Sequence, residues 1–232
     1  MKVKMSLVIW ALLLIGVATM SVFSCGGGGG GGSVYVLGDV TKGESGTPPS
    51  DVGAGVIVAS SASIISDITD ATVTVNNAGL DFFFIGYLLL SSPPAINAGE
   101  DVTLKVIHGS NTVTSTETMP EQPSISAPTN GSSHNAGSNI TVQWDSASTA
   151  PDGIYVYVSE DYTVSGIDYY SMTLAGTVTT HDIPGGTLLT GKPDIPIQVH
   201  FVNETSSFTG DVISGSVYEV EHMDQVTINT NP

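Results

Sequence analysis

Few residues in this chain have a type and spacing that point to a specific chemistry. The glycine run at residues 26–32 has no strand before it and no Lys-Ser/Thr pair after it, so it does not match a phosphate-binding loop. The paired histidines of a zinc protease, the spacing of an EF-hand and the Gly-x-Ser-x-Gly turn of a hydrolase do not occur either. We expect each of the five scattered histidines, His200 among them, to be a solvated strand or loop residue. The sequence therefore predicts no catalytic site.

Two small groups of residues are candidates for binding. Asp152, Glu160 and Asp161 lie close together in the sequence and are weak candidates for a calcium site, because calcium prefers oxygen ligands. Tyr155 and Tyr157 alternate with the apolar residues of a predicted strand, so they face outward. Outward aromatic rings either stack on sugar rings or pack across the strands of a solvated sheet. Both interpretations of the tyrosines stay open, and calcium is the single cofactor suggested.

Cys25 is the residue with the most specific surroundings. It is the only cysteine, and it stands between an apolar segment (residues 7–22) and the glycine run. Lys2 and Lys4 precede the apolar segment, and a charged start followed by an apolar stretch is typical of a secretory signal. An uncleaved membrane-spanning helix is the alternative, but seven glycines cannot continue a helix at reasonable cost.

The stretch Val22-Phe23-Ser24-Cys25 resembles the lipobox of bacterial lipoproteins, although Phe23 is bulkier than is usual there. The resemblance implies removal of residues 1–24 and attachment of lipid to the Cys25 sulfur, with more than one acyl chain as stable anchoring requires. In Gram-negative lipoproteins an aspartate after the cysteine favours the inner membrane, and here Gly26 follows it. We therefore expect a lipid-anchored protein of the bacterial outer membrane, facing the periplasm or the cell surface.

The charge of the chain narrows the classes of partner. After Cys25 there are 22 acidic residues against Lys42, Lys105 and Lys192, so the net charge is 3 − 22 = −19 with histidine neutral. Such a chain is repelled by nucleic acid, which we exclude as a partner. The lone cysteine leaves no disulfide within the chain, so the fold must depend on its apolar core.

The pattern of the remaining residues is that of an all-β protein. Runs of valine, isoleucine, threonine and aromatic residues recur between Gly, Asn, Pro and Ser clusters, with predicted strands that include 101–108, 170–175, 216–222 and 225–229. We expect a flexible, Gly/Ser-rich tether at 25–54, a β-sandwich domain at 55–119 (with an edge strand at 34–37), a linker at 120–123 and a second sandwich at 124–232. A single large sandwich that continues across the linker is the alternative.

The second domain resembles a fibronectin type III or immunoglobulin-like module. Ile140-Thr141-Val142-Gln143-Trp144 is similar to its second strand, which carries the core tryptophan. Ile154, Val156 and Val158 are similar to the inward face of its third strand, and residues 197–203 to its sixth. Two tandem immunoglobulin-like domains would share an architecture with modules of many different activities, so the resemblance implies a fold without implying a function.

The most apolar stretch after Cys25 runs from Phe82 to Leu90. We interpret it as two buried strands bent at Gly86, and an exposed patch that docks a partner is the alternative. The sequence as a whole indicates a non-catalytic, surface-displayed lipoprotein that acts as a binding or structural module in protein assembly or adhesion. The second hypothesis is a carbohydrate-binding adhesin or accessory module, with or without calcium, so the partner is another protein or a surface glycan.

Overall fold

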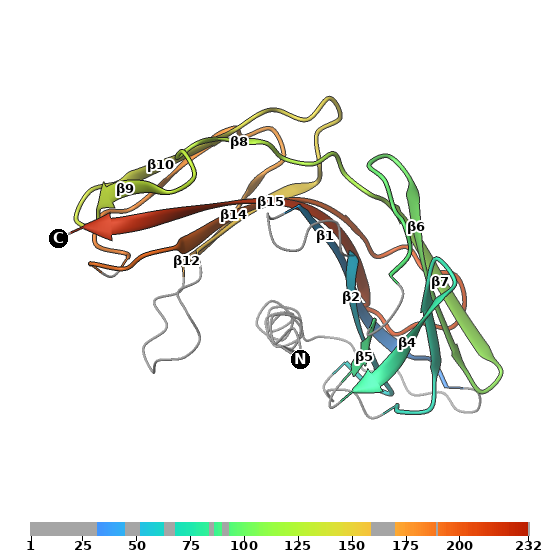
Figure 1. The fold of residues 1–232 in the computed structure, drawn as a ribbon. Coiled ribbons are helices and arrows are strands. Elements are labelled where there is room, and N and C mark those ends of the chain that lie inside the picture. Colours follow the sequence, from blue (N-terminus) through green and yellow to red (C-terminus); the bar gives the residue numbers. More distant parts are fainter. Residues whose placement is uncertain are drawn as a thin grey trace. The chain divides into compact units, whose positions relative to one another are not determined.

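The computed structural model describes residues 32–44, 52–62, 68–83, 86–89, 93–158, 170–188 and 190–231, and the predicted signal segment and Cys25 lie outside these ranges. The described residues form strands, turns and loops, which confirms the all-β class (Figure 1). They divide into two compact units. Of the described residues, the first unit contains those up to Thr41 and those within Val52–Thr118 and Glu204–Val220, and the second contains residues 42–44 and those within Met119–Asn203 and 221–231.

The first unit is built on antiparallel pairs. Its strands are β1 (Tyr35–Glu44, up to Thr41 in this unit), β2 (Val52–Ala59), β3 (Thr72–Val75), β4 (Ala78–Phe83), β5 (Gly86–Leu88), β6 (Asp101–His108) and β7 (Asn111–Thr118). β2 pairs with β5, β5 with β4, β4 with β3, β3 with β6, and β6 with β7. β4 pairs with β3 through residues 78–80 and with β5 through residues 81–83. It therefore connects the layer that contains β2 and β5 with the layer that contains β3, β6 and β7.

Alternation explains how the first unit closes its core. Val102, Leu104 and Val106 of β6 are buried, whereas the residues between them face solvent. A Cβ atom placed on Gly38 of β1 would lie 2.7 Å from Cδ2 of Leu104, so the layer of β1 packs directly on the layer of β6. Asn76 adopts φ of 45° in the two-residue turn between β3 and β4, a conformation that asparagine tolerates at low cost.

A segment from late in the sequence completes the first unit. The backbone of Thr209 donates to the Thr114 carbonyl at 2.8 Å and accepts from the Thr114 amide at 3.1 Å, which closes the edge of β7. The Val36 amide donates to Oγ of Ser216 at 3.0 Å. Tyr218, fully buried, belongs to the same segment. Glu204–Val220 is therefore an integral part of the first unit.

The second unit is a sandwich of two sheets. Its strands are β8 (Ile125–Ala127), β9 (Ser132–Asn135), β10 (Ile140–Trp144), β11 (Gly153–Val158), β12 (Tyr170–Ala175), β13 (Thr180–Ile183), β14 (Ile195–Thr205, up to Asn203 in this unit) and β15 (Val217–Asn231, from Glu221 in this unit). One sheet has the order β13-β10-β8, and the other has β12-β11-β14-β15 with β9 parallel to β15 (Figure 1).

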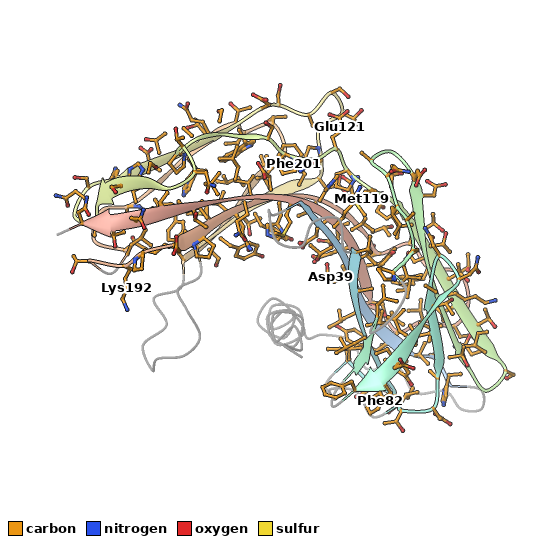
Figure 2. The ribbon with its side chains drawn as sticks, in the orientation of Figure 1. Asp39, Phe82, Met119, Glu121, Lys192 and Phe201 are labelled. Carbon is orange, nitrogen blue, oxygen red and sulfur yellow. The ribbon has the colours of Figure 1, made fainter. Side chains whose placement is uncertain are left out.

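The core of the second unit lies between these two sheets. Trp144 is 3% exposed, as its predicted place in the core requires, and its Nε1 donates to the Val178 carbonyl at 3.0 Å. The predicted inward faces of β11 and β14 supply most of the remaining core, and Phe201 is among them (Figure 2). This division of the strands around one shared core is that of an immunoglobulin-like sandwich. The predicted fold class is thus confirmed.

The structure differs from the predicted tether at 25–54. Residues 35–44 form β1 and residues 52–54 begin β2, and Val36 and Val40 are fully buried. Glycine content suggested a flexible chain here, but Gly38 is needed for the close approach to Leu104. The short edge strand expected at 34–37 is the start of this longer strand.

The boundary between the units also differs in one part from the predicted ranges. One segment of the first unit ends at Thr118, close to the linker expected at 120–123. Residues 204–220, which were expected in the second domain, belong to the first unit. The linker is partly buried: Pro120 and Pro123 are both covered, and Glu121 accepts hydrogen bonds from the amide and the hydroxyl of Ser148. The strands expected at 216–222 and 225–229 are one continuous strand, β15.

Candidate functional site

The outward face of β11 carries the two tyrosines that the sequence singled out. Ile154, Val156 and Val158 are buried in the core, so Tyr155 and Tyr157 point to the opposite side of the sheet. Their ring centroids lie 5.9 Å apart with the planes at 70°, which is an edge-to-face contact. The two rings are half-buried and form no flat, coplanar platform of the kind on which a sugar ring stacks.

A buried histidine and carboxyl lie beside these tyrosines. His200 of β14 is paired across the strands with Tyr155, and the ring of Tyr157 meets its imidazole edge-on at a centroid distance of 5.0 Å. The Nδ1 atom of His200 lies 2.7 Å from Oε2 of Glu221, and the two side chains are 0% and 4% exposed. Both residues belong to the second unit, so the pair is internal to it.

Burial decides the protonation of this pair. It lowers the pKa of His200 from its ordinary 6.5 to about 3, because the charged imidazolium loses its hydration. It raises the pKa of Glu221 from 4.5 to about 8 for the same reason. Near neutral pH the pair therefore holds one proton on the carboxyl group, and the Glu221 hydroxyl donates to a neutral imidazole. A neutral, hydrogen-bonded pair avoids the large cost of burying separate charges.

The prediction that the histidines are solvated is wrong for two of them. His200 is fully buried, and His222 is 3% exposed with Nδ1 3.1 Å from the Pro120 carbonyl oxygen, to which it donates. The sequence held a signal for His200, since Val202, two residues further on the same side of β14, is apolar and is also buried. An apolar residue on the outward side of a strand indicates that this side is covered.

The structure does not test the calcium candidates as a group. Asp152 is exposed at the start of β11, and Glu160 and Asp161 lie outside the described residues. In the first unit, Asp39 and Glu219 bring carboxylate oxygens within 4.8 Å of each other.

The apolar stretch from Phe82 to Leu90 is split between core and surface. Tyr87 is 2% exposed, and its hydroxyl donates to the Ile68 carbonyl and accepts from the Ala71 amide. In contrast, Phe82 is 36% exposed and Phe83 is 46% exposed at the end of β4 (Figure 2).

The expectation of two strands buried on both faces is therefore right for β5 and wrong for the end of β4. β5 pairs on both sides, with β2 and with β4, and is buried throughout. Phe82 makes an edge-to-face contact with the ring of Tyr87, at a centroid distance of 5.3 Å, and is still 36% exposed. Phe84, Ile85 and Leu90 lie outside the described residues.

No helix in the described part of the chain is long and apolar enough to cross a membrane. No family model and no curated protein matches the chain. Among solved structures, it is similar to a segment of two fibronectin type III domains from chicken tenascin, with 14% identity, coverage of 74% of this chain and 90% of that chain, and a TM-score of 0.24.

The chain is also similar to the chicken CNTN1 FN1-FN3 domains, with 9% identity, coverage of 77% of this chain and 62% of that chain, and a TM-score of 0.24. It thus spans less than two thirds of that second structure. At a TM-score of 0.24 neither likeness adds to the argument. The assignment of the immunoglobulin-like fold rests on the strand pairing and the core described above.

Proposed function

We propose that this chain is a non-catalytic binding module, anchored by lipid on Cys25 and displayed at the outer membrane, that takes another protein as its partner. The observation that carries the proposal is that two aromatic side chains, Phe82 and Phe83, are exposed at the end of β4, where successive residues point to opposite sides of the strand. Large aromatic residues dominate the energetics of protein interfaces.

The packing of the two tyrosines supports a protein partner over a glycan. Tyr155 and Tyr157 pack edge-to-face on each other, and Tyr157 packs in the same way on His200. The Tyr157–His200 contact is packing across two strands, which favours the second of the two roles that the sequence left open. The excess of acidic residues keeps such a protein soluble at high density on a surface and repels nucleic acid.

Site-specific photocross-linking in cells tests the proposal. A photoreactive phenylalanine analogue replaces Phe83 in the anchored protein, and the matched control places the same group at Lys105, an exposed position on β6. We expect a discrete cross-linked species at position 83 whose mass spectrum contains peptides of a second protein, and little at position 105. Equal cross-linking at both positions, or none at 83, would contradict a protein-binding role for this surface. A cross-linked species that contains no second protein and loses its added mass on glycosidase treatment would establish the glycan alternative.

A further inference from the structure

The sheet of the second unit ends in an open strand, β12. The order β12-β11-β14-β15 places β12 at the end, and all six of its residues pair with β11, from Tyr170 opposite Val158 to Ala175 opposite Gly153. Across the ranges that the structure describes, no strand pairs with the other side of β12. In an antiparallel ladder only alternate residues bond to a given neighbour, so half of the backbone amides and carbonyls of β12 point away from β11.

β12 also lacks the features that protect most sheet edges. Its sequence, Tyr-Ser-Met-Thr-Leu-Ala, contains no charged residue and no proline, the residues with which proteins usually block edge-to-edge pairing. The edge strand of the first unit, β7, has a partner on its outer side at one position, because the backbone of Thr209 exchanges two hydrogen bonds with Thr114. In the described residues, the edge of β12 is therefore open and without these protective residues over all six positions.

The core of the sandwich is incomplete at this edge. Met172 lies across the strands from Val156, which is fully buried, so the two side chains share the core-facing side of the sheet. Tyr170 and Leu174, on the same side as Met172, pack against the core. Met172 is nevertheless 40% exposed. One more strand beside β12 would cover the Met172 side chain while it satisfied the outward backbone groups.

We propose that the edge of β12 binds an extended segment of another protein by strand addition, and that this segment carries lysine or arginine. Strand addition supplies main-chain hydrogen bonds along the edge and places alternate side chains of the guest over Met172. The net charge of the chain is −17, and Asp152 is exposed next to Gly153, the residue paired with the end of β12. This charge attracts a cationic segment and disfavours a second copy of the chain as the guest.

The test uses the full mature chain and a short synthetic peptide of alternating valine and lysine. Two comparison peptides have glutamate in place of lysine, or N-methyl groups on alternate amides that remove the donors of a ladder. We expect the lysine peptide to bind, and hydrogen–deuterium exchange to slow at Tyr170–Ala175 when it does. Both comparison peptides should bind about tenfold more weakly or not at all, since like charges and lost backbone bonds each oppose pairing.

Matched variants separate the edge from general charge effects. Ser171→Lys with Thr173→Lys adds two charges to the exposed outer side of β12, and Thr141→Lys with Gln143→Lys adds the same two to β10, which has a strand on both sides. The first pair should weaken the lysine peptide about tenfold, and the second should have little effect.

Four results would overturn the inference. They are no binding of the lysine peptide, binding without protection of β12, equal binding of the glutamate or N-methylated peptide, and protection of β12 in a dimer formed without peptide. The inference depends on the second unit alone, so it can fail while cross-linking at Phe83 succeeds, and the reverse also holds.

Discussion

His200 and Glu221 form a buried hydrogen-bonded pair, with Nδ1 of the imidazole 2.7 Å from Oε2 of the carboxyl group and neither side chain more than 4% exposed. Tyr157 covers one side of the imidazole, and Gln198, the next residue on the same side of β14, bonds to Gln225 at 2.8 Å. Two linked titrations, of opposite sign, follow from this arrangement.

The first prediction is a stability plateau on the acid side of neutrality. The raised pKa of Glu221 contributes stability that is complete below 4.5 and is lost as the pH rises towards about 8. The lowered pKa of His200 contributes stability that is complete above 6.5 and is lost as the pH falls towards about 3. Between 4.5 and 6.5 the folded and unfolded pairs hold the same number of protons, so their contribution to the free energy of unfolding is level.

Urea denaturation as a function of pH measures this plateau. We expect stability to fall between about 6.5 and 8 in the wild type, because in this range the folded pair still holds the proton of the buried carboxyl whereas the unfolded pair has released both of its protons, so a rise in pH favours the unfolded state. Glu221→Gln removes that proton and should flatten the alkaline decline. The loss of stability in alkali identifies this pair, since the many other carboxylates of the chain add their own pH dependence of stability only in acid. An alkaline decline of equal size in the Glu221→Gln variant would show that another group causes it.

The second prediction concerns the loss of one partner of the pair. His200→Ala leaves the Glu221 carboxyl without its imidazole acceptor and opens a cavity beside Tyr157, so we expect a loss of about 3 kcal/mol of unfolding free energy. Gln143→Ala, an exposed position on β10, is the control and should change stability by less than about 0.5 kcal/mol. A His200→Ala variant as stable as this control would mean that the pair contributes nothing.

The third prediction concerns Trp144, which is the only tryptophan after Cys25. Its burial predicts a blue-shifted native fluorescence spectrum that moves to the red on unfolding. Trp144→Ala should cost about 3 to 5 kcal/mol through the cavity that it leaves, and Trp144→Phe should cost less. A native spectrum like that of free tryptophan in water would be incompatible with this position in the core.

The fourth prediction compares two glycines with positive φ. Gly210 has φ of +89°, and a Cβ atom there would lie 2.2 Å from the Thr112 carbonyl oxygen. Gly99 has φ of +79°, with nothing within 4 Å of its Cβ position. Gly210→Ala should therefore be about 2 kcal/mol more destabilising than Gly99→Ala, because only the first adds a clash to the backbone strain. Thermal unfolding of the two variants measures this difference, and equal losses of stability would contradict the expected clash at Gly210.

The fifth prediction concerns the anchor. Cys25→Ser should abolish incorporation of labelled fatty acid, because the sulfur that accepts the lipid is gone. The variant should stay in the membrane as uncleaved precursor or appear in the soluble fraction. Cells that express the wild type provide the control. Labelling that persists in the variant, or that never occurs in the wild type, would refute the lipoprotein hypothesis.

Local patterns in the sequence predicted individual strands well. The strands at 101–108 and 170–175 match β6 and β12, since each is bounded by turn residues and alternates or runs apolar over its whole length. The outward direction of Tyr155 and Tyr157 was also predictable, because a strand with one buried side fixes the other. These features depend only on neighbours along the chain.

What depends on distant partners was not predictable in the same way. The alternation of β14 shows that His200 faces away from the core between the sheets, but not what covers it, so the bond to Glu221 could not be anticipated. The burial of Val36 and the place of residues 204–220 in the first unit depend on each other, through the hydrogen bond from Val36 to Ser216. No local pattern reports a pairing across such a separation.

The membership of Glu204–Val220 in the first unit has a consequence for the order in which the protein is made. A ribosome or an export channel releases the chain from its N-terminus, and domains with contiguous sequences fold in that order. Here the first unit stays incomplete until most of the second unit has emerged, because the partner of Val36 lies 180 residues further along the chain. Val34 and Val36 must therefore wait, exposed, for partners that arrive near the end of synthesis. Their pairing is a late and slow event, since closing so long a loop is entropically costly.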